Sequence, residues 1–290
     1  MLPLASLHEP HTKQETKQMA SIQNKVIVIT GASEGIGAAL AIKLAAGNKL
    51  VLAARRIEKL QEVAKQVEAA GGKAHCVACD VMEQAQCENL VDESVKAFGG
   101  IDMIVNNAGV SMHAWFEDIT DLGTFERLFR VNVMSMVWIT HKALPHIKKA
   151  KGLIVGVSSL AGKTGVPART TYCTSKFAMS GFMEALRIEL MGTGVDVCAI
   201  FPGVVDTEIR RNGLNPNGER AGVSGLREKG AMTVEQCVNE IVDAMAERKR
   251  EWVMTAKGRL GLKLKPFVPA VIDKMAKDAL DDEHGGKKTA

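Results

Sequence analysis

The chain has 290 residues, of which 46% are hydrophobic and 24% are charged, and its formal net charge at pH 7 is +4. These fractions lie near the averages of soluble globular proteins and exclude bulk disorder. The charge is too small to favour nucleic acid or an anionic membrane as a partner. The length fits one large α/β domain better than two small ones. Tyrosine is scarce, because Tyr172 is the only one in the chain.

Both ends of the chain are polar, and no run of about 18 consecutive apolar residues occurs between them. We therefore expect no membrane-spanning helix. Residues 1–22 begin with an apolar stretch that is too short for a signal peptide, and the acidic Glu9 and Glu15 weaken a mitochondrial-targeting interpretation. The sequence predicts disordered tails at 1–22 and 281–290, one folded domain over 23–280, and a cytoplasmic protein.

Two of the six cysteines, Cys76 and Cys79, form a CxxC pair that could be redox-active or metal-binding. The surrounding AHCVACDV resembles a short strand, in which positions i and i+3 face opposite sides of the sheet. No second CxxC occurs to complete a zinc site, and the seven histidines are scattered. The pattern predicts buried, reduced thiols and no metal site.

Short apolar runs alternate with longer amphipathic segments from residue 25 to about residue 201. The runs expected to be strands are Lys25–Thr30, Lys49–Ala54, Ala74–Ala78, Ile101–Asn106, Leu153–Ser158 and Val195–Phe201. The segments expected to be helices are Ile36–Ala46, Ile57–Ala70, Glu83–Phe98, Gly123–Lys149 and Thr170–Met191. Near-continuous apolar strands that alternate with helices predict a Rossmann-type, doubly wound parallel sheet of about seven strands, with helices on both faces. Ligands of such sheets bind beyond the carboxyl ends of the strands.

The pattern changes after Phe201. Residues 207–232 are rich in Gly, Asn and charge, and we expect them to form a long substrate loop. Thr233 and Gln236 form a capping-box pattern that begins a helix ending near Arg248, and an edge strand is expected at Trp252–Thr255. The basic segment that follows predicts a solvated face over a packed C-terminal helix, with peripheral membrane contact as the alternative.

A glycine-rich turn follows the first predicted strand. In TGASEGIG, Gly31 allows a tight turn, Gly35 lets a pyrophosphate approach the backbone, and Gly37 allows close packing of the next helix. The amides at the start of that helix can bind the anion. The turn as a whole is predicted to contact the cofactor through Gly31, Ser33, Glu34, Gly35, Ile36 and Gly37. The spacing is GxxxGxG rather than GxGxxG, and a purely structural turn is the alternative.

The second predicted strand ends in two arginines. Sites for NAD commonly have Asp or Glu at this position, on the adenosine ribose hydroxyl. Arg55 suits a 2′-phosphate instead, and Ser33 could add a hydroxyl donor. We therefore predict NADP(H) in preference to NAD(H), and we expect Arg56 to be a solvated residue at the start of the next helix.

Tyr172 and Lys176 lie four residues apart on a predicted helix, so they project from one face. Ser159 closes the strand before that helix, and NNAG, residues 106–109, closes another strand. Together with TGASEGIG, CDV, the asparagine of VNV and Pro202-Gly203, this ordered set over residues 24–210 strongly resembles the short-chain dehydrogenase/reductase family. Within it, the chain is most similar to the branch of 11-beta-hydroxysteroid dehydrogenases and dehydrogenase/reductase member 7-like proteins.

The residue types fit this chemistry. Hydride transfer to a carbonyl puts negative charge on its oxygen, which must be stabilised and protonated. A free tyrosine has a pKa of about 10, and a nearby Lys176 ammonium would lower it. The resemblance implies that Tyr172 delivers the proton and Ser159 donates a hydrogen bond to the carbonyl oxygen. It also implies that Lys176 binds the nicotinamide ribose and that Asn132 holds a water of the proton relay.

The resemblance also implies further cofactor contacts by position. These residues are Asp80, Val81, Asn107, Ala108, Gly109, Pro202, Gly203, Val205 and Thr207, in addition to Tyr172 and Lys176. Glu34 departs from the basic residue that is frequent at its position in NADP-preferring relatives.

The expected function is thus an NADP(H)-dependent oxidoreductase acting on a small molecule, a lipophilic ketone or aldehyde or the matching alcohol. A homodimer or homotetramer is expected, because the family pairs the helices at residues 122–137 and 177–190 across subunits. The alternatives are a non-catalytic NADP(H)-binding sensor or scaffold, and a sugar epimerase or dehydratase of the longer related fold, which the GxxxGxG spacing opposes.

Overall fold

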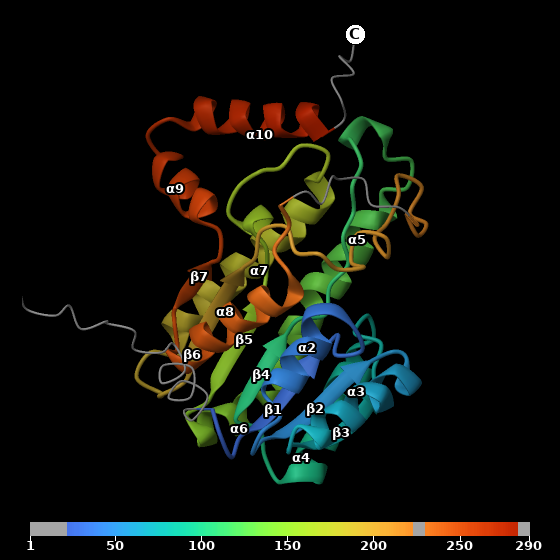
Figure 1. The fold of residues 1–290 in the computed structure, drawn as a ribbon, viewed down its shortest axis with the longest axis vertical. Coiled ribbons are helices and arrows are strands. Elements are labelled where there is room, and N and C mark those ends of the chain that lie inside the picture. Colours follow the sequence, from blue (N-terminus) through green and yellow to red (C-terminus); the bar gives the residue numbers. More distant parts are fainter. Residues whose placement is uncertain (1–21, 223–229, 284–290) are drawn as a thin grey trace, which may run out of the picture.

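The computed structural model describes residues 22–222 and 230–283. Its centre is a seven-stranded parallel sheet with the order β3-β2-β1-β4-β5-β6-β7 (Figure 1). The strands are β1 (Val26–Thr30), β2 (Lys49–Ala54), β3 (Lys73–Ala78), β4 (Met103–Asn106), β5 (Leu153–Val157), β6 (Asp196–Phe201) and β7 (Glu251–Val253). The predicted fold class and the predicted number of strands are confirmed.

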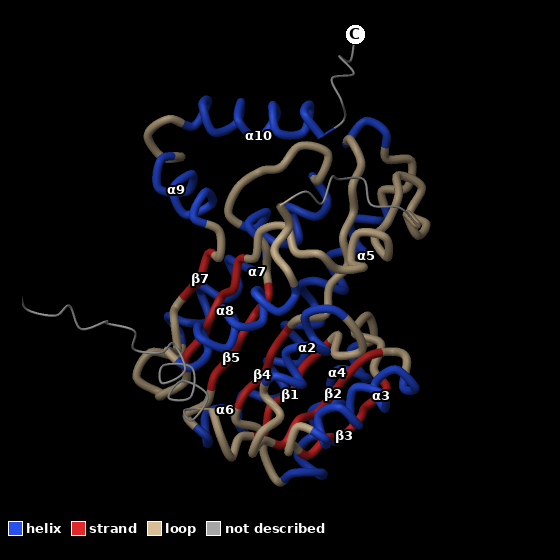
Figure 2. Tube along the Cα trace, in the orientation of Figure 1, coloured by secondary structure: helices blue, strands red, loops and turns tan. Residues whose placement is uncertain are grey.

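Helices cover both faces of this sheet, as Figure 2 shows. The longer ones are α2 (Gly35–Lys43), α3 (Ile57–Ala69), α4 (Gln84–Phe98), α5 (Gly123–Phe129), α6 (Ser135–Ala150), α7 (Thr170–Glu189), α8 (Val234–Ala246), α9 (Ala256–Leu264) and α10 (Pro269–Glu283). Buried side chains of α2, α3 and α8 form one core with the strands, and those of α4, α6 and α7 form a second core on the other face. Two buried faces explain why the strands are apolar at successive positions.

The strand order reverses at β1, which pairs with β2 on one side and with β4 on the other. In a doubly wound sheet, ligands bind in the crevice beyond the carboxyl ends of the strands at this reversal. The turn after β1 and the segment after β4 therefore meet at one place, and the segments after β5 and β6 extend the same edge of the sheet.

The helix expected over Gly123–Lys149 is divided. Between α5 and α6 the chain makes a π-helical turn, η2 (Arg130–Met134), which contains Asn132. The period of the apolar residues does not reveal such a turn, since it inserts only a local change from i→i−4 to i→i−5 hydrogen bonding. Turns of this kind occur frequently at functional sites.

The C-terminal part agrees with the sequence up to β7. The capping box of Thr233 and Gln236 is present at the start of α8, and β7 is the expected edge strand. The prediction of a packed C-terminal helix is wrong, because large apolar side chains are exposed on α10 and in the segment before it. Phe267, before α10, is 83% exposed, and Met275, on α10, is 54% exposed. Figure 1 shows α10 at the end of the molecule away from the sheet.

The ends of the described chain differ slightly from the expected domain boundaries. Ile22 is 4% exposed and belongs to the core, and α10 continues to Glu283. The other residues of the expected tails, 1–21 and 284–290, and residues 223–229 of the expected substrate loop lie outside the described part. Within the described part, no helix is long and apolar enough to cross a membrane.

Candidate active site

The turn after β1 is built from glycines that leave no room for side chains. Gly31 and Gly35 have φ angles of 65° and 57°, a region that other residues rarely adopt. A Cβ on Gly37 would lie 2.3 Å from the carbonyl oxygen of Gly31. Helix α2 starts directly after this turn without an acidic residue in its first turn, so its unpaired amides suit an anionic phosphate. Ser33 is partly buried in the turn, and Ile36 packs against the core.

Asn107 ties the end of β4 to this turn. Its side-chain amide donates to the carbonyl oxygen of Thr30 at 2.9 Å and to that of Gly31 at 3.3 Å. The Thr30 hydroxyl accepts in turn from the backbone amides of Asn107 and Ala108, each at 3.0 Å. These bonds hold the predicted nucleotide turn and the NNAG segment together at the strand reversal.

Glu34 joins the glycine turn to two other segments. Its carboxylate accepts from Arg56 at 2.7 Å and from the side-chain amide of Asn212, in the segment after β6, at 3.0 Å. The ammonium of Lys59 lies 3.9 Å from the same carboxylate. Arg56 is therefore not the purely solvated residue that was expected, because Glu34 draws it against the turn. Arg55 is exposed just after β2. Together with Arg56 and Lys59, it is one of three cationic side chains near the glycine turn.

Asp80 and Val81 form the turn after β3. The Asp80 carboxylate accepts from the amide of Met82 at 3.0 Å, and the Asp80 amide donates to the Gln86 side chain at 2.8 Å. Val81 is 9% exposed. Both residues thus lie in a turn fixed by its own hydrogen bonds, at the carboxyl edge of the sheet.

The segment after β6 lies against the glycine turn. Pro202 is buried and Gly203 is partly buried, and Val205 is 8% exposed and belongs to the core. The methyl group of Thr207 lies 3.6 Å from the position that a Cβ on Gly35 would take. The structure therefore brings this predicted contact segment to the same crevice as the turn after β1.

Three of the four predicted catalytic side chains meet where β5 ends and α7 begins. Ser159 follows β5 and hydrogen-bonds to Tyr172. Lys176 lies one turn further along α7, with its Nζ 5.7 Å from the centre of the Tyr172 ring. This Nζ donates to the carbonyl oxygen of Val157 at 3.0 Å. Tyr172 is 6% exposed and Lys176 is 3% exposed, so both act in a site of low dielectric.

Burial changes the protonation of this pair. Desolvation raises the pKa of Tyr172 and outweighs the opposing effects of Arg169, the Ser159 hydrogen bond and Arg210. Desolvation, with repulsion from Arg169, lowers the pKa of Lys176 to about 7. The expected lowering of the Tyr172 pKa by Lys176 is therefore wrong for this structure. A lysine that is half deprotonated at neutral pH attracts a phenolate less than a permanent cation does.

Arg169 lies at the candidate site although it belongs to none of the sequence motifs. Its guanidinium carbon lies 4.3 Å from the centre of the Tyr172 ring, and a guanidinium over an aromatic face is attracted to it. The spacing in the sequence could have indicated this contact. Arg169 precedes Tyr172 by three residues at the start of the predicted helix, so the two side chains are expected on the same helix face.

Asn132 is 1% exposed, and its side chain is fully engaged. Its Oδ1 accepts from the Val110 amide at 2.8 Å, and its Nδ2 donates to the Val110 carbonyl at 3.0 Å and to the Ser175 hydroxyl at 2.9 Å. A Cβ on Gly109 would lie 3.2 Å from Asn132 Oδ1 and 3.6 Å from Lys176 Nζ. The Asn132 side chain thus fixes the segment after β4 against α7.

The cysteines are all free thiols. Cys76 is half-buried in β3, whereas Cys79 is buried after its end and hydrogen-bonds to Cys87 on α4 rather than to Cys76. Burial raises the pKa of the Cys76 thiol, and it raises the pKa of Cys237 to about 12. Among residues 22–222 and 230–283, no three His, Cys, Asp or Glu side chains gather where they could hold a metal ion.

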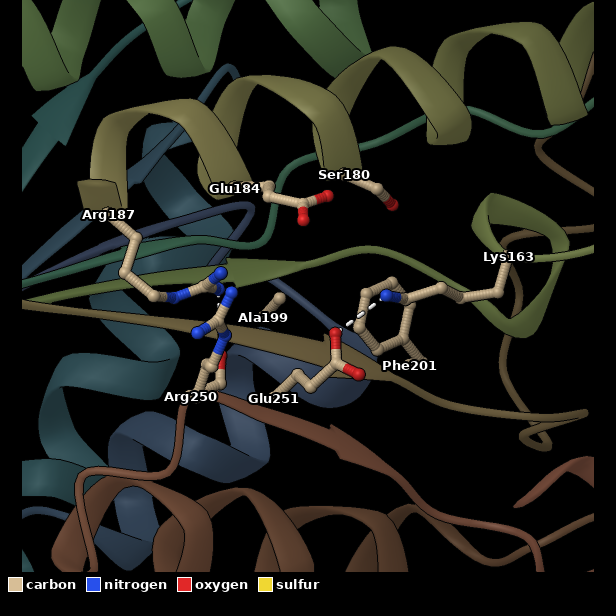
Figure 3. Close-up of a pocket in the computed structure, with 8 residues that line it drawn as sticks. All are labelled: Lys163, Ser180, Glu184, Arg187, Ala199, Phe201, Arg250 and Glu251. Atoms are coloured by element: carbon tan, nitrogen blue, oxygen red, sulfur yellow. Dashed lines mark hydrogen bonds and ion pairs between the residues drawn. The ribbon is translucent and has the colours of Figure 1, made fainter. Parts of the chain in front are cut away.

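A separate cavity of about 180 Å³ lies further along α7, between α7 and strands β6 and β7 (Figure 3). Three of the five charged side chains that line it are engaged within the protein. Lys163 pairs with Glu251 at 2.6 Å, and Arg187 donates to the backbone carbonyls of Val197 and Arg250 at 3.0 and 2.9 Å. None of the predicted site residues lines this cavity, so we regard it as part of the packing of the sheet edge.

Comparison with known proteins agrees with this geometry. The family model described as short chain dehydrogenase matches residues 25–217. The chain is 34% identical over 286 residues to a dehydrogenase/reductase SDR family protein 7-like of Dictyostelium discoideum, with 94% of this chain and 89% of that protein covered. It is 33% identical over 259 residues to 11-beta-hydroxysteroid dehydrogenase A of Sesamum indicum, with 87% and 74% covered.

A solved structure is similar over most of the fold. It is a short chain dehydrogenase/reductase from Burkholderia phymatum in complex with NAD, with a TM-score of 0.76 and 26% sequence identity, and the match covers 87% of this chain and 96% of that one. The chain belongs to the short-chain dehydrogenase/reductase family, near the branch of 11-beta-hydroxysteroid dehydrogenases and member 7-like proteins.

Proposed function

We propose that the protein is an NADP(H)-dependent oxidoreductase that interconverts a lipophilic ketone or aldehyde and the matching alcohol. The observation that carries the proposal is the meeting of Ser159, Tyr172 and Lys176 beside the glycine turn, at one edge of the sheet. A sensor or scaffold would need the turn but would not need these three groups.

The residues of the crevice fit a dinucleotide. Gly31 and Gly37 allow the turn to pack against the protein backbone where a Cβ would collide, and the first-turn amides of α2 would hold the pyrophosphate. Lys176 would bind the nicotinamide ribose. When bound, the nicotinamide supplies the hydride. Ser159 would donate a hydrogen bond to the substrate oxygen, and the phenol of Tyr172, kept protonated by its raised pKa, would deliver the proton that the reduction consumes.

The surroundings of Tyr172 are apolar, which supports a lipophilic substrate. Its ring belongs to a small cluster that is separate from both cores of the sheet and includes part of the segment after β6. The cluster consists of Met112, Ala114, Leu128, Ala161, Tyr172 and Cys173, with Val110, Ile119, Val166 and Leu214 packed against it. Apolar walls with a few polar groups are typical of small-molecule sites.

Self-association through α5, α6 and α7 is part of the proposal. These helices border an open cavity of about 410 Å³ whose lining includes Phe129 and Trp138. Phe129 and Phe177 are 39% and 44% exposed on the same helices. Exposed aromatic side chains of this kind are enriched at protein interfaces.

Replacing Arg55 with alanine should change the cofactor preference. We expect the KM for NADPH to rise about 10- to 100-fold, because one charge-assisted contact of about 1.5–3 kcal/mol is lost. The KM for NADH should stay unchanged, since that cofactor has no 2′-phosphate. The measurement is steady-state oxidation of NADPH and NADH in parallel with a panel of apolar ketones.

Lys65→Ala is the matched control, because it removes an exposed cation from α3 outside the turn. It should leave both KM values unchanged. Comparable wild-type rates with NADH and NADPH, or an equal loss for both cofactors in Arg55→Ala, would remove Arg55 as the selector of the phosphate.

A further inference from the structure

Arg169 carries a charge that no neighbouring carboxylate balances. Its Nη2 donates to the Ser111 hydroxyl at 2.5 Å, and its guanidinium stacks on the Tyr172 ring. Its Nε is buried and has no hydrogen-bond partner. Among the described residues, no Asp or Glu lies within ion-pair distance of it. Arg169 is half-buried, and a half-buried cation without a counter-charge beside the predicted catalytic groups points to an anionic ligand.

The backbone holds Arg169 firmly in this position. Ala168 has a φ angle of 55° and is 3% exposed, a strained conformation for a residue with a Cβ. The Ala168 carbonyl accepts from the amide of Ala114 at 2.8 Å, and Ala114 forms a β-bridge with Arg169. The guanidinium is thus anchored to the segment after β4, which also supplies Ser111.

Arg169 is the charged group with the largest effect on Tyr172. Arg169 and Arg210, the latter in the segment after β6, each lower its pKa, Cys173 raises it, and no carboxylate is among the groups that act on it. Arg169 directly precedes α7, whose first turn has no acidic residue. The main charge beside the phenol is therefore positive.

We propose that Arg169 binds an anionic group of the substrate, a carboxylate or a phosphate ester that lies a few bonds from the carbonyl. The inference rests on the oxidoreductase function proposed above and names its substrate class more closely. An anion oxygen at the guanidinium would supply a charged acceptor that its donor fork lacks in this structure. Because the same guanidinium covers the phenol ring, the anion and the reacting carbonyl have to be close together in the substrate.

The test compares matched substrates with and without the charge. Suitable pairs are 3-oxooctanoate with methyl 3-oxooctanoate, and 2-oxooctyl phosphate with 1-hydroxyoctan-2-one. For the wild type we expect kcat/KM to be at least about 10-fold higher for the anion in one pair. Arg169→Gln should abolish that preference, mainly through KM, and Arg169→Lys should retain part of it, because lysine keeps the charge but loses the fork.

Arg250→Gln is the control, since Arg250 lines the remote cavity of Figure 3 and the same unit of charge is removed. It should leave the preference unchanged. A preference for the anion that survives in Arg169→Gln, or a wild type that prefers neither anion, overturns the proposal. Arg169→Lys decides the same question if Arg169→Gln does not fold, by the size of the remaining preference.

Calorimetric titration of octanoate and of inorganic phosphate into protein with NADP⁺ separates this proposal from the proposed function. At least one of these anions should bind the wild type and bind Arg169→Gln at least about 10-fold more weakly. If no carbonyl compound is turned over but this difference is found, the anion site stands and the oxidoreductase proposal fails. Equal binding to both proteins overturns the anion site.

Discussion

Tyr172→Phe is expected to lower kcat with any ketone substrate by about 10³-fold or more, because the substitution removes the proton donor and leaves the shape of the site intact. The measurement is the rate of NADPH oxidation at saturating cofactor. The hydroxyl lies in an enclosed site at 6% exposure, and water therefore cannot readily replace it as a donor. Phenylalanine keeps the apolar packing of the ring, so only about 1 kcal/mol of folding stability, from the Ser159 hydrogen bond, should be lost.

Binding of NADPH distinguishes a catalytic role of Tyr172 from a structural one. The dissociation constant, measured by the fluorescence of the cofactor, should change less than about 10-fold in Tyr172→Phe, whereas kcat falls. Turnover that persists at a tenth of the wild-type rate would show that another group supplies the proton. Lys176, whose pKa burial lowers to about 7, would then be the first alternative.

Gly37→Ala should abolish cofactor binding at micromolar concentrations of NADPH. The added Cβ would lie 2.3 Å from the Gly31 carbonyl oxygen and 2.6 Å from the side-chain nitrogen of Asn107, so the start of α2 has to move away from the turn. We expect at least a 100-fold rise in the dissociation constant. The free energy of unfolding should fall by about 1–3 kcal/mol, as is usual for an overpacked site. Calorimetric titration and denaturant unfolding measure the two effects.

Gly181→Ala is the matched control for this substitution. Gly181 is exposed on α7, and a Cβ there would meet nothing within 4 Å. It should leave the affinity for NADPH unchanged and stabilise the helix by up to about 1 kcal/mol. Wild-type affinity in Gly37→Ala would contradict the proposed position of the pyrophosphate at this turn.

Most of the fold could be predicted from the sequence, because the patterns that indicate strands and helices each lie within a short stretch of the chain. Apolar runs of strand length and amphipathic segments of helix length follow one another along the chain, and the strands are found within one to three residues of the expected bounds. The capping box at Thr233 is likewise a local pattern of residue types. Parallel order then follows from the alternation itself.

The features that the sequence did not predict depend on contacts between distant segments of the chain. The ion pair of Arg56 with Glu34 joins residues 22 positions apart, and the residue types alone do not indicate that the two side chains meet. The raised pKa of Tyr172 depends on how completely the fold excludes water, which residue spacing cannot give. The π turn at Asn132 arises where α5 and α6 have to present the asparagine to Val110 and Ser175.

Arg169 was overlooked for a related reason. The resemblance assigns no catalytic role to its position, and an arginine before a helix resembles an ordinary solvated charge. Only the packing of Arg169 on Tyr172 and the positive φ of Ala168 separate it from such a charge. The contact with the Tyr172 ring therefore adds Arg169 to the candidate site, beyond the residues of the motif.

The most direct test of the account follows the hydride. The protein is incubated with NADPH that carries deuterium at C4 of the nicotinamide and with the panel of apolar and anionic ketones, and the products are analysed by mass spectrometry. The account predicts that at least one ketone yields an alcohol that carries the deuterium, and that Tyr172→Phe yields none above background. Binding of NADPH without deuterium in any alcohol would contradict it and favour a sensor or scaffold.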